Sequence, residues 1–304
     1  MHVVVMGAGA VGATYAHFLK RAGAKLTFLV RDKYAAEVKA GLRMYRGNKS
    51  VLMQPDAVIT RASEIKDADQ LWLAIPTTGI DDAGLREIAA ASGRALVIDL
   101  MPDADRRARK IIGEARVVEG GIPFIAYQTP IAGTTEEGRA PGIAYWIPPG
   151  APTPLAGSRA AEAAALLKKG GMSAKVVADV GEGRAFGGAV LMCIIWHIEA
   201  ANWSLTRARR NFDGAAAEAL AIVKKDTGRA PPAMLKLVQH PFVARMGLFV
   251  APPFMPLPLE PYIRYHFTKV GAQSHQGLAH LIARADALGV DAPCLKRLAK
   301  QLLR

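Results

Sequence analysis

Three glycines near the start of the chain, Gly7, Gly9 and Gly12, have the spacing G-x-G-x-x-G. In this pattern the first glycine permits a tight turn, the second lets a diphosphate approach the backbone, and the third lets a helix pack closely on a strand. The spacing therefore predicts a site for the diphosphate of a dinucleotide. The residues expected to contact it are Gly7, Ala8, Gly9, Ala10, Val11 and Gly12.

The elements that must position these glycines are also indicated by the sequence. The run Val3-Val4-Val5-Met6 is β-branched and uncharged, which is typical of a strand buried on both faces of a parallel sheet. Apolar residues then recur at helical spacing from Ala10, and Lys20 and Arg21 precede the helix-stop signal Gly23. The N-terminus of such a helix attracts an anion through free N–H groups and a partial positive charge. A purely structural turn is the alternative.

The second predicted strand, "KLTFLV", ends at Arg31. An acidic residue at this point would bind the ribose hydroxyls of NAD or FAD, whereas a guanidinium suits a 2′-phosphate and stacks on adenine. The expected cofactor is therefore NADP(H). Asp32 follows at once, and it either faces the ribose, which would reverse the preference, or caps the next helix.

The rest of the first 179 residues alternates buried strands with helices, including a hairpin around Gly47-Asn48. This alternation predicts an α/β fold, a Rossmann-type doubly wound parallel sheet with ligands beyond the carboxyl ends of its strands. Ile75, Pro76 and Thr77, which end the strand at 70–75, are thereby expected beside the cofactor. The sheet is expected to continue through strands at 115–120, 121–128, 142–147 and 173–180.

From about residue 180 the pattern changes to long helices at 184–210, 214–228, 275–289 and 293–304. The predicted organisation is a dinucleotide-binding domain over 1–179 and a mainly α-helical substrate or dimerisation domain over 180–304. The proline-rich apolar stretch 247–267 cannot be regular throughout. It is interpreted either as a lid or substrate wall, or as a loop buried in a subunit interface.

Composition narrows the class of protein. The 304 residues are 51% apolar and 21% charged, which is ordinary for a globular enzyme. Met1-His2 leads directly into a strand, so no signal peptide is expected, and the apolar run 189–196 is too short to span a membrane. Cys193 and Cys294 give neither a disulfide framework nor a metal site, so we expect a reducing cytoplasm and no metal.

The net charge of +13 raises the question of nucleic acid, with "RRARK" at 106–110 and "TRARR" at 206–210 as basic patches. Neither patch has interleaved aromatic residues. A basic surface that attracts anionic cofactors and substrates is the preferred interpretation. The expected partners are a small-molecule substrate and a second copy of the chain in a homodimer, with neither nucleic acid nor membrane.

The stretch "VVVMGAGAVGATYAHFLKRAGAKLTFLVRDKYAAEVKAGL" resembles the ketopantoate reductase family, within the 6-phosphogluconate dehydrogenase-like superfamily. The resemblance covers about the first hundred residues, and the ending "ALGVDAPCLKRL" is also similar. It implies an NADP-binding domain, an all-helical domain and delivery of hydride to a ketone in a cleft. The family has an Asn-Gly pair after its fifth strand, where this chain has Leu100-Met101.

The resemblance also implies a lysine and two asparagines along the first long helix, for which this chain has Gly188, Met192 and Trp196. The family's acid near the C-terminal helices falls near Gln273. The chain thus lacks the usual catalytic lysine and asparagines, so ketopantoate itself is not the expected substrate. Met192 and Trp196 would make the site apolar and suit a bulky substrate.

Three side chains are candidates for the proton donor that carbonyl reduction requires: Glu199, His197 and Lys269. Each has a structural alternative, namely a salt bridge for Glu199, a hydrogen-bonded core histidine for His197, and a solvated surface lysine for Lys269. The expected substrate contacts are Met192, Trp196, Asn202 and His266.

The predicted function is reduction of a carbonyl or imine by an NADPH-dependent oxidoreductase. Two alternatives stay open: an NADP-dependent alcohol, amine or opine-type dehydrogenase working oxidatively, and a non-catalytic NADP-binding sensor or scaffold.

Overall fold

The computed structural model describes residues 1–101, 105–250, 254–269 and 271–302. Its chain divides into two compact units, Met1–Pro130 with Glu136–Val180, and Ile131–Thr135 with Gly181–Arg304. We refer to these as the N-terminal unit and the helical unit. The division at Val180 lies next to the boundary predicted at 179/180, whereas the assignment of Ile131–Thr135 to the helical unit was not predicted.

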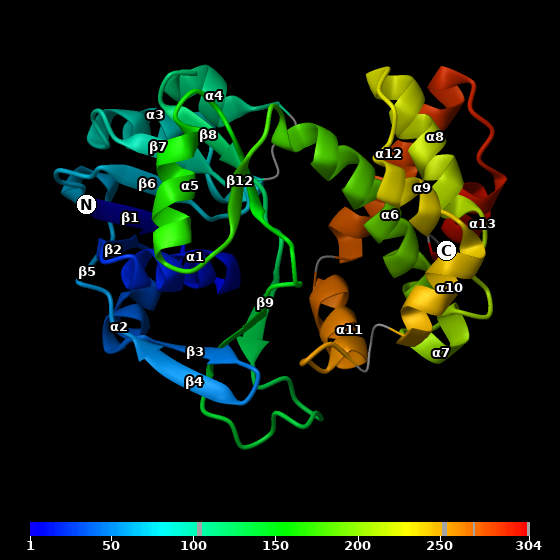
Figure 1. Cartoon of the computed structure of the whole chain (residues 1–304), viewed down its shortest axis with the longest axis horizontal. Helices are drawn as coiled ribbons and strands as arrows, with labels where there is room; N and C mark the ends of the chain where they lie inside the picture. Colours follow the sequence, from blue (N-terminus) through cyan, green and yellow to red (C-terminus); the bar gives the residue numbers. More distant parts are fainter. Residues whose placement is uncertain (102–104, 251–253, 270, 303–304) are drawn as a thin grey trace. The chain divides into compact units, whose positions relative to one another are not determined.

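The N-terminal unit contains an eight-stranded sheet in the order β12-β11-β8-β7-β6-β1-β2-β5 (Figure 1). The pairings from β5 to β8 are parallel, and β11 is antiparallel to β8. Its strands are β1 (His2–Met6), β2 (Lys25–Leu29), β5 (Ala57–Ile59), β6 (Gln70–Leu73), β7 (Leu96–Asp99), β8 (Val117–Gly120), β11 (Thr153–Ala156) and β12 (Ala174–Val176). The predicted doubly wound α/β fold is confirmed.

Helices cover both faces of this sheet, as the alternation of its side chains requires. Val3 and Val5 pack with residues of α1 and α5, and Val4 packs on the opposite face with residues of α3 and α4. The helices of this unit are α1 (Ala10–Arg21), α2 (Asp32–Ala40), α3 (Asp82–Ala91), α4 (Arg107–Ile112) and α5 (Ala160–Lys169), with short 3₁₀ turns η1 (Ala62–Glu64) and η2 (Thr77–Gly79). The unbroken apolar runs of the strands therefore reflect burial on two faces.

The predicted hairpin is present as β3 (Leu42–Arg46) and β4 (Lys49–Met53), but it belongs to a second sheet. This sheet has the order β4-β3-β10-β9, with β9 (Ile125–Thr129) antiparallel to β10 (Gly142–Trp146). The expectation that residues 121–128 and 142–147 continue the main sheet is wrong. Aromatic residues such as Tyr145 and Phe124 share a core with α1, so α1 is covered by both sheets.

The helical unit is built around α6 (Val180–Ala200). Side chains of α6 share one core with α8, α12 and α13, and Cys193 and Trp196 are the α6 members that are fully buried there. The remaining helices are α7 (Leu205–Ala208), α8 (Ala215–Thr227), α9 (Ala233–Val238), α10 (Pro241–Val250), α11 (Leu259–Lys269), α12 (Gly271–Leu288) and α13 (Pro293–Leu302).

The single helix predicted over 184–210 is wrong, because α6 ends at Ala200. Asn202 and Trp203 have left-handed backbone conformations, with φ of 53° and 60°, which no α-helix can contain. Ser204 then caps α7 by accepting a hydrogen bond from the Arg207 amide. Among the described helices, none combines the length and the apolar character needed to cross a bilayer.

Candidate functional site

The glycine turn joins β1 to α1 and depends on two positions without a side chain. Gly7 has φ of +98°, and a Cβ there would lie 2.7 Å from the Ala74 carbonyl oxygen. A Cβ on Gly12 would overlap the carbonyl oxygen of Gly7. The first and third glycines therefore close the turn and let α1 pack against the strands, as the pattern predicts.

Gly9 differs from the other two glycines because a Cβ there would meet no protein atom within 4 Å. It is the N-cap residue of α1, no side chain caps this helix, and the first turn contains no acidic residue. The first amide groups of α1 thus have no side-chain cap, and the helix end carries a partial positive charge beside the open space at Gly9. Open space, free donors and positive potential together fit a diphosphate.

Arg31 lies two residues beyond the carboxyl end of β2, the strand that pairs with β1. Its side chain is exposed, its guanidinium carbon lies 5.2 Å from the ring centre of Tyr34, and within the described residues no carboxylate pairs with it. Lys33 adds a second cation 4.9 Å from the same ring. Asp32 begins α2, and the N-cap position belongs to Arg31. The end of β2 therefore presents two cations and an aromatic ring.

The structure also brings the predicted loop after β6 to the glycine turn. The methyl Cγ2 of Ile75 lies 2.8 Å from the position that a Cβ on Gly7 would take. Arg107 of α4 fixes this loop by donating hydrogen bonds to the carbonyl oxygens of Thr77 (2.9 Å) and Ile80 (3.3 Å). The sequence indicated Arg107 only as part of a basic patch. Its role as a loop anchor depends on contacts 27 and 30 residues away.

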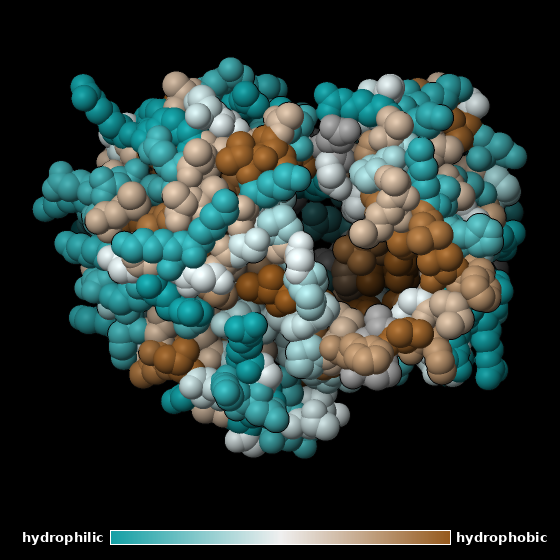
Figure 2. All heavy atoms as spheres, viewed as in Figure 1, coloured by the Kyte–Doolittle hydropathy of each residue, from teal (hydrophilic) through white to brown (hydrophobic). Residues whose placement is uncertain are grey.

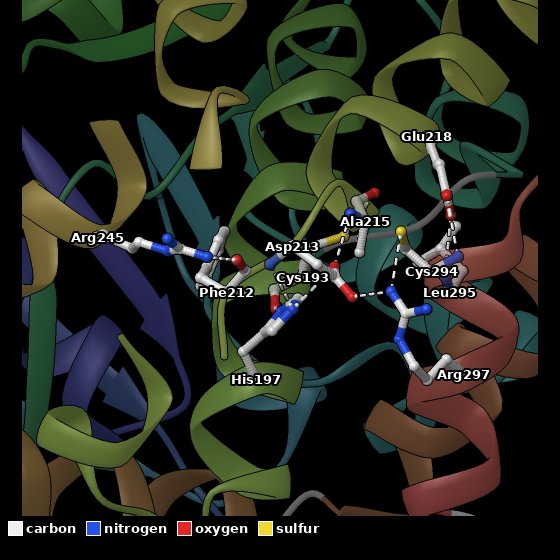
Figure 3. Close-up of polar contacts among 10 residues, drawn as sticks. All are labelled: Cys193, His197, Phe212, Asp213, Ala215, Glu218, Arg245, Cys294, Leu295 and Arg297. Carbon is white, nitrogen blue, oxygen red and sulfur yellow. Dashed lines mark hydrogen bonds and ion pairs between the residues drawn. The ribbon is translucent and has the colours of Figure 1, made fainter. Parts of the chain in front are cut away.

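In the helical unit both ring nitrogens and the ring face of His197 contact other residues (Figure 3). Its Nδ1 lies 2.7 Å from the Cys193 carbonyl oxygen, its Nε2 lies 3.0 Å from Asp213 Oδ1, and its ring stacks on Phe212 at 4.2 Å between centres. Only 4% of the residue is exposed. Both ring nitrogens thus have partners within the core, which favours the structural alternative for this histidine.

Asp213 connects His197 to the last helix. Its Oδ2 accepts a hydrogen bond from Arg297 at 2.6 Å. Burial alone would raise the pKa of Asp213, but the hydrogen bonds from His197 and Arg297 outweigh it and hold that pKa well below its usual range. Glu218 makes a second link, because its carboxylate accepts hydrogen bonds from the amides of Cys294 and Leu295 at 2.9 Å (Figure 3). Sequence reasoning missed both acids, whose partners are distant in the chain.

Glu199 lies near the end of α6 with 17% of its side chain exposed. Its Oε1 is 2.8 Å from Nε2 of His275, a residue of α12 with 30% of its side chain exposed. This carboxylate and imidazole form a hydrogen-bonded pair that solvent can reach, unlike the enclosed pair of His197 and Asp213. His275 was not among the predicted site residues.

The predicted substrate contacts on α6 are separated by the structure. Trp196 is buried in the core of the helical unit, where its Nε1 donates a hydrogen bond to Ser274 Oγ at 3.0 Å. Met192 is half-buried, and Asn202 is exposed in the turn after α6. Gly188, Met192 and Glu199 are spaced i, i+4 and i+11, on one face of the helix.

The remaining predicted residues belong to α11. Lys269 is exposed at its C-terminal end, and His266 stacks on Tyr262 with ring centres 5.7 Å apart. Burial, and then the charge of Lys269, lower the pKa of His266. Burial raises the pKa of Tyr262 to about 12. Both rings are therefore uncharged at neutral pH. Among the described residues no cluster of His, Cys, Asp or Glu has the makings of a metal site.

The strand order and the glycine turn define a Rossmann-type fold, which a helical unit follows in the chain. A family model described as "Ketopantoate reductase PanE/ApbA" matches residues 3–131. Over these residues the chain is similar to that family, which confirms the resemblance predicted from the sequence. Ketopantoate reductases are oxidoreductases, so the matched part of the chain is similar to an oxidoreductase family.

Solved structures extend the likeness of fold to the whole chain. A 2-dehydropantoate 2-reductase from Porphyromonas gingivalis W83 has a TM-score of 0.68 at 17% identity, covering 100% of this chain and 99% of its own. A PanE/ApbA family ketopantoate reductase from Ralstonia eutropha JMP134 has a TM-score of 0.67 at 20% identity, covering 100% and 97%.

D-mandelate dehydrogenase, solved with NADH and anilino(oxo)acetate, has a TM-score of 0.71 at 12% identity, covering 100% and 97%. No curated protein sequence matches the chain.

Proposed function

We propose that this protein is an NADPH-dependent oxidoreductase that reduces the carbonyl or imine group of a bulky or apolar organic molecule other than ketopantoate. The observation that carries the proposal is the glycine turn, where the open space at Gly9 adjoins an uncapped helix N-terminus. Bound NADPH would supply a hydride to the substrate carbon. Residues of this chain would bind the cofactor, donate the proton and position the substrate.

The diphosphate would be held by the first amide groups of α1, and the 2′-phosphate by Arg31 with Lys33 beside it. Arg31 suits this role because no carboxylate of the described residues neutralises it, and because Tyr34 supports its guanidinium from below. Arg107 would keep the Ile75–Thr77 loop in place beside the cofactor through its hydrogen bonds to Thr77 and Ile80.

For the proton donor we favour Glu199, acting with His275. The alkoxide or amide anion formed by hydride addition needs a proton from a group within hydrogen-bond reach. The 2.8 Å contact between His275 Nε2 and Glu199 Oε1 lets the pair hold such a proton and share it with solvent. His197 and Lys269 are the other two candidates; the first is enclosed in the core of the helical unit, and the second is exposed at the end of α11.

The substrate would lie against the α6 face formed by Gly188, Met192 and Glu199. A Cβ on Gly188 would meet nothing within 4 Å, so this face offers space for a bulky group where the family has a lysine. His266 and Asn202 are proposed as further contacts. A cytoplasmic location and a homodimer complete the proposal.

A second candidate is an NADP-dependent dehydrogenase acting in the oxidative direction on a hydroxy acid. It is favoured by the similarity of fold to D-mandelate dehydrogenase, which was solved with anilino(oxo)acetate. Both candidates share one cofactor site and one acid–base pair.

The test is NADPH oxidation over a panel of aliphatic and aromatic 2-oxo acids, ketones and imines, with the reverse reaction measured on the matching alcohols and amines. We expect turnover of bulky or aromatic members and little of ketopantoate. Glu199→Gln should lower kcat by roughly 10²- to 10⁴-fold and leave NADPH affinity unchanged, because general acid catalysis contributes about that much. Tight NADPH binding with no turnover of any member would instead favour a sensor.

A further inference from the structure

The segment from Gly228 to Pro258 contains no aspartate or glutamate, although it spans α9, α10 and the residues after them. Its formal charges are Arg229, Lys236 and Arg245, all positive. Surface segments of this length normally carry both signs of charge. The absence of acidic residues here is a property of the sequence that the proposed catalytic function does not require.

Large apolar side chains are exposed on the same segment. Figure 2 shows brown side chains gathered on the helical unit where Figure 1 draws α9 and α10. The exposed members are Phe254 (77%), Met234 (76%), Phe242 (65%), Leu237 (61%), Phe249 (59%), Val250 (47%) and Met246 (43%). We call this set the α9–α10 apolar face. Large apolar side chains gathered on an exposed surface indicate an interaction site.

Basic side chains border the α9–α10 apolar face. The guanidinium of Arg209 lies over the ring of Phe249, 5.1 Å from its centre. Arg210 follows Arg209 in the chain, and Lys236 belongs to α9, the helix that carries Met234 and Leu237. Arg210 and Lys236 are exposed, and neither pairs with a carboxylate of the described residues. The neighbouring acid, Glu260, is occupied in accepting a hydrogen bond from the Leu205 amide at 2.8 Å. The border is therefore positively charged.

We propose that the α9–α10 apolar face docks on an anionic lipid bilayer surface and holds the protein there as a peripheral, non-spanning component. Helices that lie in the plane of a bilayer combine Phe and Leu on one side with Lys and Arg on the other. Anionic headgroups attract each basic residue near the surface. The apolar run 189–196 is too short for a membrane span, but docking of this kind requires none.

The charge distribution favours lipid over a second copy of the chain. A twofold dimer through this face would bring two positively charged borders into one interface, to which the segment 228–258 contributes no acidic residue. Like charges at close range are destabilising. An anionic bilayer complements both the apolar side chains and the positive border.

The test is flotation of the full chain with vesicles of phosphatidylcholine alone, or of phosphatidylcholine with phosphatidylglycerol, at low and high salt. We expect association with the anionic vesicles only, weakened by salt. Phe242→Asp and Phe254→Asp should each lower the partition coefficient by roughly tenfold or more, given the transfer energy of a phenyl side chain. Arg210→Glu and Lys236→Glu should each lower it by about fivefold or more.

The matched control is Leu52→Asp, an exposed apolar residue (45%) on β4 of the N-terminal unit, which should bind vesicles as the parent protein does. Circular dichroism of each variant verifies that it is folded. The proposal is overturned if the parent protein does not bind anionic vesicles, or if the phenylalanine variants bind these vesicles as well as Leu52→Asp does. It is also overturned if the parent protein is a dimer that these variants dissociate without any vesicle binding.

Discussion

Gly9→Ala should weaken NADPH binding without destabilising the fold, whereas Gly12→Ala should destabilise the fold, although the two glycines belong to one motif. At Gly9 the backbone has φ of −68° and ψ of −179°, an extended conformation open to any residue, and a Cβ would meet no protein atom within 4 Å. The fold should therefore tolerate Gly9→Ala, with a change in unfolding free energy of about −0.5 to +0.5 kcal/mol, as for surface substitutions.

The added methyl group occupies the space that we assign to the diphosphate. Inserting a methyl group into a filled site costs about 1 to 3 kcal/mol, which corresponds to roughly a 5- to 150-fold increase in the dissociation constant for NADPH. Gly12→Ala, by contrast, places its methyl group on the Gly7 carbonyl oxygen and must displace backbone. We expect a loss of stability of about 3 kcal/mol or more, since overpacking against backbone leaves no flexible atom to yield.

The assays are urea unfolding followed by circular dichroism and NADPH titration followed by fluorescence, on both variants. We expect Gly9→Ala to be stable but to bind NADPH poorly, and Gly12→Ala to be unstable. If Gly9→Ala bound NADPH as tightly as the parent protein, the open space at Gly9 would not be the diphosphate site. The reasoning from Cβ positions would be refuted in that case.

Two further predictions concern buried polar groups. Tyr15 donates a hydrogen bond of 2.6 Å to the Gly121 carbonyl oxygen inside the N-terminal unit, so Tyr15→Phe should leave that oxygen unpaired and lower the unfolding free energy by about 1 to 3 kcal/mol, measured by urea unfolding; no change would show that the bond contributes nothing. Asp213 has a lowered pKa in the folded state, so its contribution to stability is present above the unfolded pKa of about 3.9 and is lost as the pH falls through the lower folded value. Urea unfolding from pH 7 to pH 2 should therefore show a larger loss of unfolding free energy below about pH 4 for the parent protein than for Asp213→Asn, which is already less stable at pH 7. Equal dependence of the unfolding free energy on pH in the two proteins would contradict the assigned hydrogen bonds.

The N-terminal unit could be predicted from sequence because its signals are local. The glycine spacing, the β-branched run before it and the helical periodicity after it lie within the first 23 residues. Arg31 was predicted for the same reason, since it ends a strand that the pattern already indicates. The misplacement of residues 121–128 and 142–147 has a physical cause: an apolar run predicts a strand but does not indicate which sheet it joins.

The helical unit was harder to predict because its site depends on contacts between distant residues. His275 and Glu199 are 76 residues apart, and Arg297 and Asp213 are 84 apart, so no spacing rule brings them together. The end of α6 was missed because Asn202 and Trp203 adopt left-handed conformations without a glycine or proline to indicate the break. Trp196 was expected to contact substrate because helical phase alone does not distinguish the buried side of a helix from its open side.

The central claim, a site for NADPH formed by the glycine turn and Arg31, is tested most directly by titrating the protein with NADPH and NADH and repeating both titrations on Arg31→Ala. The matched control is Arg86→Ala, which removes an exposed guanidinium from α3 of the same unit. Loss of a charged hydrogen bond to the 2′-phosphate should weaken NADPH binding by about 1.5 to 3 kcal/mol, or roughly 10- to 150-fold, and leave NADH binding nearly unchanged. The claim would be contradicted if Arg31→Ala weakened NADPH and NADH binding equally, or if Arg86→Ala weakened NADPH binding as much as Arg31→Ala does. Binding of neither nucleotide by the parent protein would also contradict it.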